Sequence, residues 1–463
     1  MPLKVIIVGA GIGGLSAATA FHQAGHHVEI FEKSHFLSEV GAALVVAPNG
    51  VRVLSTLGFS FENARSKPKS TFELRDGKDF ERIDSVSATP VETTFGAPLY
   101  TMQRADLHEE LFRCATTPIP GLSNVSIRLG AKVCSADPFA GTVHLEDGSI
   151  HTADLIIGAD GLHSILKSGV LDGQPDVPIS TSYTAFRFQI PTDALSDDPD
   201  FLDLLAKKGH GPSILADVSN HITAEHMVWY DCQNGEMQNF VGIQNNLQTD
   251  DDDPMQSLLS KFSHFHPGLM RVISKAPKVT KWPLKVFRPL RRWSRGKLLL
   301  IGDAAHPMLP FSGQGANQAI EDAGALRILF HNYVSPDEMP ARLSLFENVR
   351  KFRVSRVQTM SSVRVGKEEE IQEELQKYAD HPGADVPRTF HERLGHDFSY
   401  DVLEVTGAKL REYEVNRKLQ DTSSQRLPFP VSNVSLAVAW LRENLFSFSN
   451  SWQGYFFAPR NGQ

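Results

Sequence analysis

Three glycines and a glutamate near the N-terminus have the types and spacing of a dinucleotide-binding fingerprint. Gly9, Gly11 and Gly14 follow the apolar run LKVIIV, and Glu32 ends the next apolar run. The first glycine permits a tight turn, the second lets the backbone approach a pyrophosphate, and the third lets helix and strand pack closely. A glutamate in this place accepts hydrogen bonds from a ribose 2′-hydroxyl and disfavours a 2′-phosphate. The pattern therefore predicts FAD or NAD as the ligand.

Two further strand-to-helix turns carry an aspartate. DLIIGADGLHSILK places Asp160 after one apolar run, and KLLLIGDAAHPMLPFSGQGANQAIEDAG places Asp303 after another. An aspartate at the carboxyl end of a strand can bind the hydroxyls of an extended chain such as ribitol. The helix that starts in SGQGA offers backbone N–H groups and a positive dipole end without side chains in the way. Because this suits the N1–C2=O edge of a flavin, the stretch favours FAD over NAD.

In this order and spacing, the motifs GAGIGG, GADGLHS and GDAAHPMLPFSGQGANQAIEDA resemble those of the class A flavoprotein aromatic hydroxylases. The resemblance covers roughly residues 3–365 and is closest to the salicylate-hydroxylase branch. It implies FAD as a tightly bound prosthetic group, NADH or NADPH as electron donor, and a flavin C4a-hydroperoxide as oxidant. The cofactor-binding residues that it implies are Gly9, Gly11, Gly14, Glu32, Arg104, Asp160, Asp303, Pro310, Gly313, Gly315 and Ala316.

Four of the matched positions have a second interpretation or depart from the family pattern. Asp160 matches a motif that the family associates with both FAD and the nicotinamide nucleotide, but an aspartate that caps a simple strand-to-helix turn is the alternative. Arg104, in YTMQRADLHEEL, matches an arginine that contacts FAD, but a surface arginine at a helix start is the alternative. Ala316 belongs to a helix whose small residues also serve close packing. Lys167 stands where the family has an arginine at the end of the second motif, and a lysine cannot form the same bidentate contact.

The elements that must position these residues indicate an α/β fold. The apolar runs at residues 3–8 and 28–31 predict buried parallel strands around one helix, and the run before Asp160 adds another strand. From about residue 176 to 290, alternating stretches such as SYTAFRFQI predict a mainly antiparallel sheet with one covered face. We expect a Rossmann-type FAD-binding domain, an inserted mainly antiparallel sheet substrate domain and a helical C-terminal region.

The expected boundaries follow these changes of pattern. Residues 338–376 carry an apolar stripe that predicts one long helix, and the acidic run 250–253 predicts a solvated loop. Residues 377–463 predict a mixed, partly helical tail. The predicted divisions are 1–70 and 101–175 for the first parts of the FAD-binding domain, 71–100 and 176–290 for the substrate domain, 291–365 for the return to the FAD-binding domain, and 366–463 for the C-terminal helical region.

Arg187, His226 and Tyr230 are the candidate catalytic residues. Arg187 alternates with phenylalanines in YTAFRFQI, and a buried arginine needs a partner. The resemblance implies a substrate contact there, while an outward-facing charge is the alternative. His226 and Tyr230, in EHMVWYDC, are either substrate contacts or ordinary sheet residues. Activation of a phenol means favouring its phenolate, which a cation or a hydrogen-bonded base can do.

The bulk composition limits the class of protein. A chain of 463 residues predicts two or three domains, and a net charge of -8 argues against a nucleic-acid partner. Three cysteines without CxxC or metal-ligand spacing predict no disulfide framework, no metal site and a reducing compartment. No stretch reaches the roughly 18 uninterrupted apolar residues of a membrane span. We expect a cytoplasmic enzyme that acts on a small-molecule aromatic substrate with O2, and the sequence leaves its oligomeric state open.

Three functions remain compatible with the sequence. The first is hydroxylation of a phenolic aromatic small molecule with NAD(P)H and O2. The second uses the same chemistry to epoxidise or hydroxylate a larger electron-rich ring, such as an indole in secondary metabolism. The third is a flavin-binding reductase that inserts no oxygen. NAD(P)H oxidation that depends on an aromatic compound but leaves it unoxygenated would favour the third.

Overall fold

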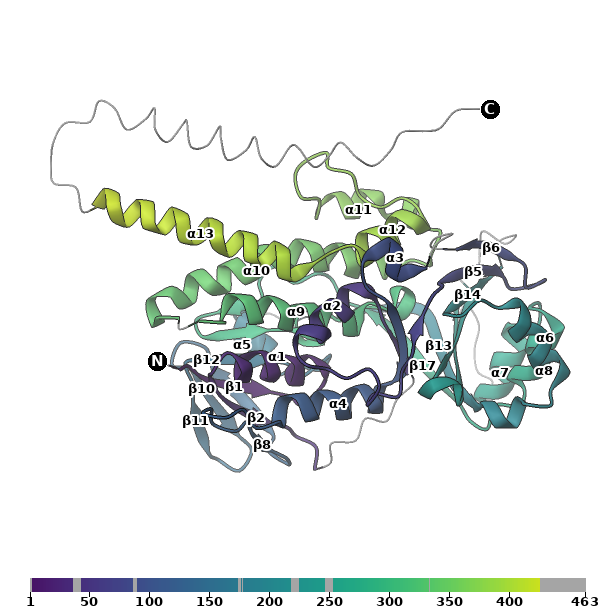
Figure 1. The fold of residues 1–463 in the computed structure, drawn as a ribbon, viewed down its shortest axis with the longest axis horizontal. Helices are drawn as coiled ribbons and strands as arrows, with labels where there is room; N and C mark the ends of the chain where they lie inside the picture. Colours follow the sequence, from purple (N-terminus) through teal and green to yellow (C-terminus); the bar gives the residue numbers. More distant parts are fainter. Residues whose placement is uncertain are drawn as a thin grey trace. The chain divides into compact units, whose positions relative to one another are not determined.

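The computed structural model describes residues 2–35, 43–85, 90–173, 176, 178–217, 225–245, 253–332 and 334–424 (Figure 1). Residues Met1–Leu410 form one compact unit, and Arg411–Gln463 form a second. The helix α13 (Val402–Ser424) continues across this division. All residues discussed below as a site belong to the first unit.

A largely parallel sheet carries the N-terminal fingerprint. Its strand order is β18-β19-β12-β1-β2-β8, and only the pairing of β18 with β19 is antiparallel. In β1, Val5, Ile6 and Ile7 are fully buried, because both faces of a parallel sheet are covered. The strands are β1 (Lys4–Val8), β2 (His27–Phe31), β8 (Ser126–Arg128), β12 (Leu155–Gly158), β18 (Ser294–Arg295) and β19 (Leu298–Leu300).

Helices pack on this sheet and on one another. Helix α1 (Ile12–Gln23) contacts β1 and β2 and lies between α4 (Arg104–Thr116) and α9 (Gly315–Leu329). Helix α10 (Met339–Met360) packs on α9 in turn. The mixed α/β class with a parallel sheet is therefore confirmed.

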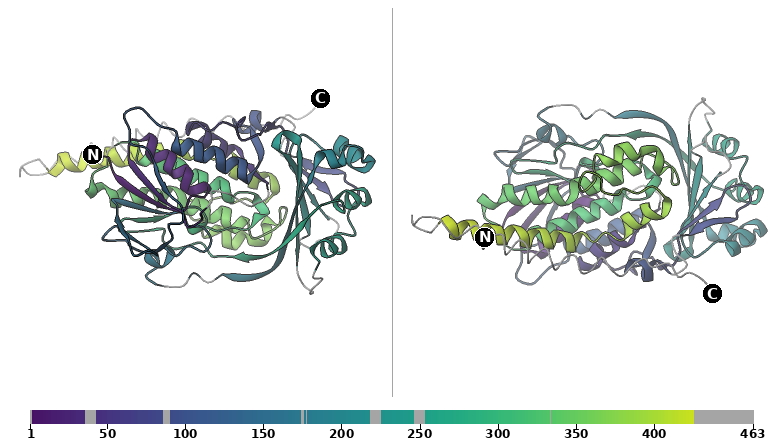
Figure 2. Two further views of the ribbon diagram at one scale, coloured as in Figure 1. Left: turned by 90° about the horizontal axis from the view of Figure 1, so that it is seen from below. Right: turned by 90° about the horizontal axis from the view of Figure 1, so that it is seen from above.

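A second sheet of seven strands has the order β17-β13-β16-β15-β14-β5-β6. Every pairing in it is antiparallel except that of β14 with β5. In Figure 2 this sheet is seen nearly edge-on, with α6, α7 and α8 on its outer side and the parallel sheet with its helices on the other. The strands are β5 (Glu73–Asp76), β6 (Arg82–Ser85), β13 (Ile179–Pro191), β14 (Ser213–Ala216), β15 (His226–Cys232), β16 (Met237–Asn245) and β17 (Val279–Val286). The three helices are α6 (Pro199–Lys207), α7 (Pro254–Lys261) and α8 (Pro267–Ile273).

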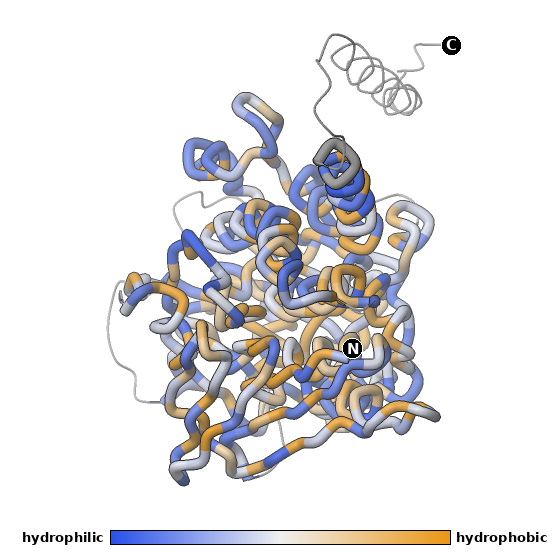
Figure 3. Tube along the Cα trace, turned by 90° about the vertical axis from the view of Figure 1, so that its left-hand side faces the viewer, coloured by the Kyte–Doolittle hydropathy of each residue, from blue (hydrophilic) through white to orange (hydrophobic). Residues whose placement is uncertain are grey.

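Alternation along β13 gives this sheet two different faces. Phe186, Phe188 and Ile190 belong to the buried cluster shared with the outer helices. Ala185 and Arg187, which alternate with them, point to the opposite face. Figure 3 views the molecule from the side of the parallel sheet, where hydrophobic stretches lie mainly along the inner segments and hydrophilic stretches mainly along the outer ones.

Smaller elements complete the first unit. Two three-stranded sheets are formed by β3 (Ala43–Val46), β7 (Leu99–Gln103) and β4 (Pro68–Lys69), and by β9 (Val133–Asp137), β10 (Thr142–Leu145) and β11 (Ile150–Thr152). The remaining α-helices are α2 (Pro48–Thr56), α3 (Val91–Phe95), α5 (Lys167–Val170), α11 (Gln372–Gln376) and α12 (Phe390–Phe398). None of the helices in these described ranges is both long and apolar enough to cross a bilayer.

The prediction of one helix over residues 338–376 is wrong, because α10 ends at Met360. The hydroxyls of Ser361 and Ser362 donate to backbone carbonyls three residues earlier, and serines that do so compete with helix continuation. Gly366 then adopts a left-handed φ of 87°. Of the predicted acidic loop, residues 250–252 lie outside the described residues, whereas Asp253 caps α7 by accepting from the Met255 amide. Residues 425–463 of the predicted tail also lie outside.

Candidate active site

The glycine turn after β1 has the geometry that its sequence predicts. Gly9 has a φ of 104°, and its amide donates to the Phe31 carbonyl at 2.8 Å. A Cβ at Gly9 would lie 2.4 Å from the Ala159 carbonyl oxygen, and one at Gly14 only 2.0 Å from the Gly9 oxygen. A Cβ at Gly11 would meet nothing within 4 Å. Gly9 and Gly14 therefore permit tight backbone packing, and Gly11 leaves open space in front of the N-terminus of α1.

This open space belongs to a cavity of about 350 Å³. Five of the residues predicted to bind the cofactor line it, and these are Gly9, Gly11, Glu32, Arg104 and Asp160. Gly14 is not among the lining residues, because it is buried inside the turn. The three strand ends and the start of α4 thus bring together side chains that are far apart in the sequence.

The two carboxylates of the cavity have different environments. Glu32 accepts hydrogen bonds from the amides of Ala10 and Ser34, each at 2.8 Å. Asp160 Oδ2 accepts from the Ile165 amide at 2.9 Å, whereas its buried Oδ1 has no hydrogen-bond partner among the described residues. Burial raises the pKa of Asp160 above its ordinary value. An unpartnered acceptor beside an open glycine turn fits a ligand that carries hydroxyl groups and a pyrophosphate, as FAD does.

His108 is a cavity residue that the sequence analysis did not select. Its Nε2 lies 2.7 Å from the Ala10 carbonyl oxygen, so the side chain ties α4 to the glycine turn. It stands four residues after Arg104, on the same face of the helix. This spacing from Arg104 was the signal in the sequence from which His108 could have been predicted to line the same cavity.

The second half of the predicted cofactor site lies after β19. Asp303 is exposed in the short turn Gly302–Ala304 that follows the strand. Pro310 begins the turn Pro310–Ser312, Gly313 is left-handed with a φ of 61°, and α9 begins at Gly315. Ala316 is partly buried in the first turn of α9. These five residues do not line the 350 Å³ cavity; they lie on the loop that joins β19 to α9 and in the first turn of α9.

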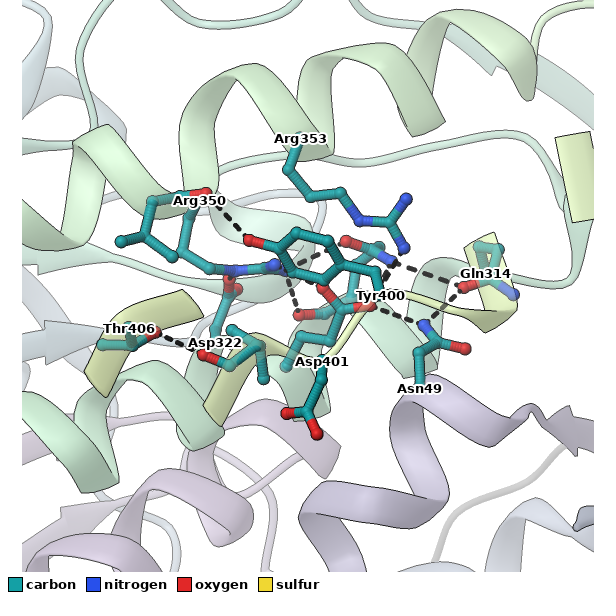
Figure 4. Close-up of polar contacts among 12 residues, drawn as sticks. Asn49, Gln314, Asp322, Arg350, Arg353, Tyr400, Asp401 and Thr406 are labelled. Atoms are coloured by element: carbon teal, nitrogen blue, oxygen red, sulfur yellow. Dashed lines mark hydrogen bonds and ion pairs between the residues drawn. The ribbon is translucent and has the colours of Figure 1, made fainter. Parts of the chain in front are cut away.

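A buried group of charged residues on α9 and α10 is hydrogen-bonded to this loop (Figure 4). Asp322 Oδ2 accepts from the Gly302 amide at 2.9 Å and lies 2.7 Å from His306 Nε2, while its Oδ1 accepts from Arg350 Nε at 2.9 Å. Although burial opposes ionisation, His306 and Arg350 hold the pKa of Asp322 below its ordinary value. One carboxylate therefore joins the Asp303 turn to α9 and α10.

Glu321 extends the same group to the start of α9. It forms ion pairs with Arg350 and, at 3.3 Å, with Arg353. Asn49 donates to Glu321 at 2.5 Å and to Gln314 at 3.0 Å. The sequence analysis missed this group, although two acidic residues in a Gly/Ala-rich helix and arginines three residues apart in α10 were visible signals.

The three candidate catalytic residues share the inner face of the seven-stranded sheet. The register aligns Arg187 with Val241 and Val228, and Val228 lies between His226 and Tyr230 in β15. These residues thus occupy neighbouring positions on the face opposite the apolar core.

The loop before α9 packs against this inner face. The Phe311 ring lies 5.2 Å from the rings of both His226 and Tyr183. Phe311 and Leu309 also join a buried cluster with Ala185. The loop predicted to adjoin the flavin therefore meets the sheet predicted to hold the substrate.

Tyr230 and Arg187 differ in whether their polar groups are free to contact a ligand. Tyr230 is buried, its hydroxyl donates to the Ala43 carbonyl at 2.7 Å, and burial raises its pKa well above its usual range. Arg187 is partly buried, and within the described ranges no carboxylate forms an ion pair with its guanidinium. Burial lowers the pKa of Arg187, the nearby Tyr230 opposes this and Arg104 adds to it. Arg187 is thus available to a ligand, whereas the Tyr230 hydroxyl is engaged.

The chain is similar to known proteins in sequence and in fold. Residues 2–361 match the FAD binding domain family. The FAD-dependent monooxygenase cfoG of Aspergillus candidus is 32% identical over 427 residues, which cover 90% of this chain and 97% of that protein. Hispidin-3-hydroxylase of Neonothopanus nambi is 32% identical over 363 residues, covering 76% and 86%. A salicylate hydroxylase substrate complex shares the fold, with a TM-score of 0.67, 24% identity and coverage of 89% and 97%.

Proposed function

Since the chain belongs to the class A flavoprotein aromatic hydroxylases, which are FAD-dependent monooxygenases, we propose that it uses NAD(P)H and O2 to hydroxylate a phenolic small molecule. The observation that carries the choice of a phenol is the guanidinium of Arg187 on the inner face of the seven-stranded sheet, with which no carboxylate of the described residues forms an ion pair. A cation in this place favours the anionic form of a ring hydroxyl, because an opposite charge nearby lowers the pKa of an acid.

The cofactor would extend over two regions, the 350 Å³ cavity at the glycine turn and the loop between β19 and α9. When bound, FAD accepts a hydride from NADH or NADPH and activates O2, so the side chains need not perform redox chemistry. The glycine turn, Glu32, Arg104 and Asp160 would hold the AMP half. Asp303 would hold the ribityl chain, and Pro310, Gly313, Gly315 and Ala316 would border the flavin ring.

The protein's own task is to orient the substrate and exclude water. Phe311, Leu309 and Ala185 form a dry contact beside Arg187, and His226 closes it with its ring against Phe311. Tyr230 contributes indirectly, because its hydroxyl ties the sheet to β3. We assign residues 71–100 and 176–290 to the substrate domain, since β5 and β6 join the sheet formed by β13 to β17.

An absorbance spectrum followed by an oxidation assay tests the proposal. The purified protein should be yellow, and a panel of phenols and indoles should be tested for faster oxidation of NADH or NADPH. Faster oxidation with a phenol, together with one oxygen gained by that phenol, supports the proposal. Protein that binds no flavin overturns it. Acceleration by indoles alone favours the larger-ring function, and indifference to every aromatic favours a reductase.

A further inference from the structure

Helix α12 lies outside the segment that matches the FAD binding domain family, but it contacts the loop before α9. Phe390, Leu394 and Phe398 recur every four residues and pack into a buried cluster with residues of β3, β7 and β14. This apolar stripe fixes the rotation of the helix. Arg393, beside Leu394, is consequently directed inward and is only 1% exposed.

The guanidinium of Arg393 has two kinds of partner. Its Nη1 forms an ion pair with the fully buried Glu368 at 2.9 Å and also donates to the Val363 carbonyl at 3.3 Å. Its Nη2 donates to the hydroxyl oxygen of Ser312. Glu368 thus neutralises the positive charge of Arg393, and the second amino group, Nη2, binds the loop through Ser312.

Ser312 is the residue before the left-handed glycine of the loop. It ends the turn Pro310–Ser312, the left-handed Gly313 follows, and α9 begins at Gly315. The loop is held upstream by the Leu309 amide, which donates to Ser361 Oγ at 3.2 Å, and downstream by Gln314. Among the described residues, Arg393 supplies the one hydrogen bond to the Ser312 side chain. Gly313 itself donates its amide to the Pro310 carbonyl and accepts from Asn317 Nδ2 at its own carbonyl, each at 3.0 Å. The bond from Arg393 to Ser312 therefore adds a restraint from the C-terminal segment to a turn that α9 also holds.

We propose that Arg393 is a positioning residue for the flavin. Through Ser312 it fixes the peptide groups that lead into α9, so the C-terminal segment helps to set flavin retention and flavin reactivity. This inference rests on the proposed function, since it requires FAD at this loop. It also gives a role to a helix that lies beyond the matched FAD-binding segment.

Ser312→Ala in the full-length holoenzyme is the informative variant. An Arg393 substitution would leave Glu368 buried without its partner and endanger folding, whereas Ser312→Ala leaves that ion pair intact. We expect FAD release, measured by recovery of free-flavin fluorescence, to become at least about tenfold faster, as for loss of a hydrogen bond to a charged group. The midpoint potential of the bound flavin should also shift. Ser312→Thr retains a hydroxyl and should restore both values.

Ser274→Ala is the matched control. It also removes a serine hydroxyl that forms a hydrogen bond: Ser274 Oγ donates to the Arg271 carbonyl at 2.7 Å, at the end of α8 on the outer side of the seven-stranded sheet. Release rate and potential should stay at the wild-type values there. A folded Ser312→Ala protein with wild-type release and potential would overturn the role of Arg393, as would faster release that Ser312→Thr fails to restore. Wild-type protein without flavin would instead overturn the proposed function.

Discussion

Arg187 illustrates at a single residue how burial and availability combine. Its strand neighbours Phe186 and Phe188 are committed to the core on the other face, so Arg187 lies on the inner face, near Tyr230 and Arg104. We predict that Arg187→Met lowers kcat/KM for the aromatic substrate by about tenfold to a hundredfold, the value of a hydrogen bond to a charged group. FAD content should change little. Steady-state oxygenation and the flavin absorbance of the same preparation measure both effects.

Two further variants give this prediction its controls. Arg187→Lys keeps a positive charge but loses the planar fork, so its activity should lie between wild type and Arg187→Met. Arg271→Met removes an exposed arginine that pairs with Asp200 on α6, and should leave turnover unchanged. Wild-type turnover in Arg187→Met would exclude a substrate contact at this residue.

Asp160 predicts a pH dependence of stability. Burial raises its pKa, so the folded chain retains the proton to a higher pH than the unfolded chain does. Its contribution to stability is therefore largest at low pH and is lost as the pH rises through the folded-state pKa. Asp160→Asn should raise the melting temperature of the FAD-free protein at pH 7, and this gain should shrink towards pH 4.

Asp137 supplies a control of opposite sign for the same measurement. The amides of Ala140 and Phe139 donate to its carboxylate and lower its pKa. Its stabilising effect is present at neutral pH and is lost on acidification, so Asp137→Asn should lower the melting temperature at pH 7. Thermal unfolding of wild type and both variants between pH 4 and 7 measures these opposite changes in melting temperature. An Asp160→Asn protein that is less stable than wild type at pH 7 would contradict the assignment.

At the scale of the element, the strand–turn–helix unit assigns different tasks to neighbouring glycines. Gly11→Ala places a methyl group in open space, so the protein should fold normally but lose at least about tenfold in FAD affinity, because the pyrophosphate can no longer approach closely. Gly14→Ala places its Cβ 2.0 Å from the Gly9 oxygen and should destabilise the fold itself. Melting curves and flavin content separate the two effects. Full flavin occupancy in Gly11→Ala would contradict the prediction.

The same elements show what the sequence can predict. The apolar run at residues 3–8 and the glycine spacing predict β1 and the turn to α1, because these depend on local residues. Alternation around Arg187 predicts that it lies on the face opposite Phe186 and Phe188, but leaves open whether that face is solvated or meets the substrate. The long helix over residues 338–376 is predicted wrongly, since the stripe continues past serines and Gly366, which end it. The ion pairs of Asp322 and Glu321 with Arg350 depend on how α9 and α10 pack, which no local pattern contains.

At the scale of the whole molecule, the candidate site is made where two sheets meet. Segments far apart in the chain form this contact: Tyr183 and His226 come from the seven-stranded sheet, and Phe311 comes from the loop that follows the parallel sheet. Apolar runs with their motifs predict the parallel sheet and alternating stretches predict the antiparallel one, but the contact between the two sheets depends on side-chain packing. We therefore expect the exclusion of water from the candidate site to depend on these aromatic side chains rather than on either sheet alone.

A substitution at Phe311 tests whether the aromatic contact between the two sheets keeps water out. It is 4% exposed and packs with Leu309, Ala185 and Ile243. Phe311→Ala leaves a cavity, and such truncations cost about 3–5 kcal/mol in well-packed sites. With this wall removed, we expect water to reach the site, so that NAD(P)H oxidation continues while hydroxylated product per NAD(P)H falls at least about twofold and hydrogen peroxide rises. Phe139→Ala removes an exposed ring and should leave the ratio unchanged. Unaltered coupling in a folded, flavin-loaded Phe311→Ala protein would show that the contact between the sheets does not keep the site dry.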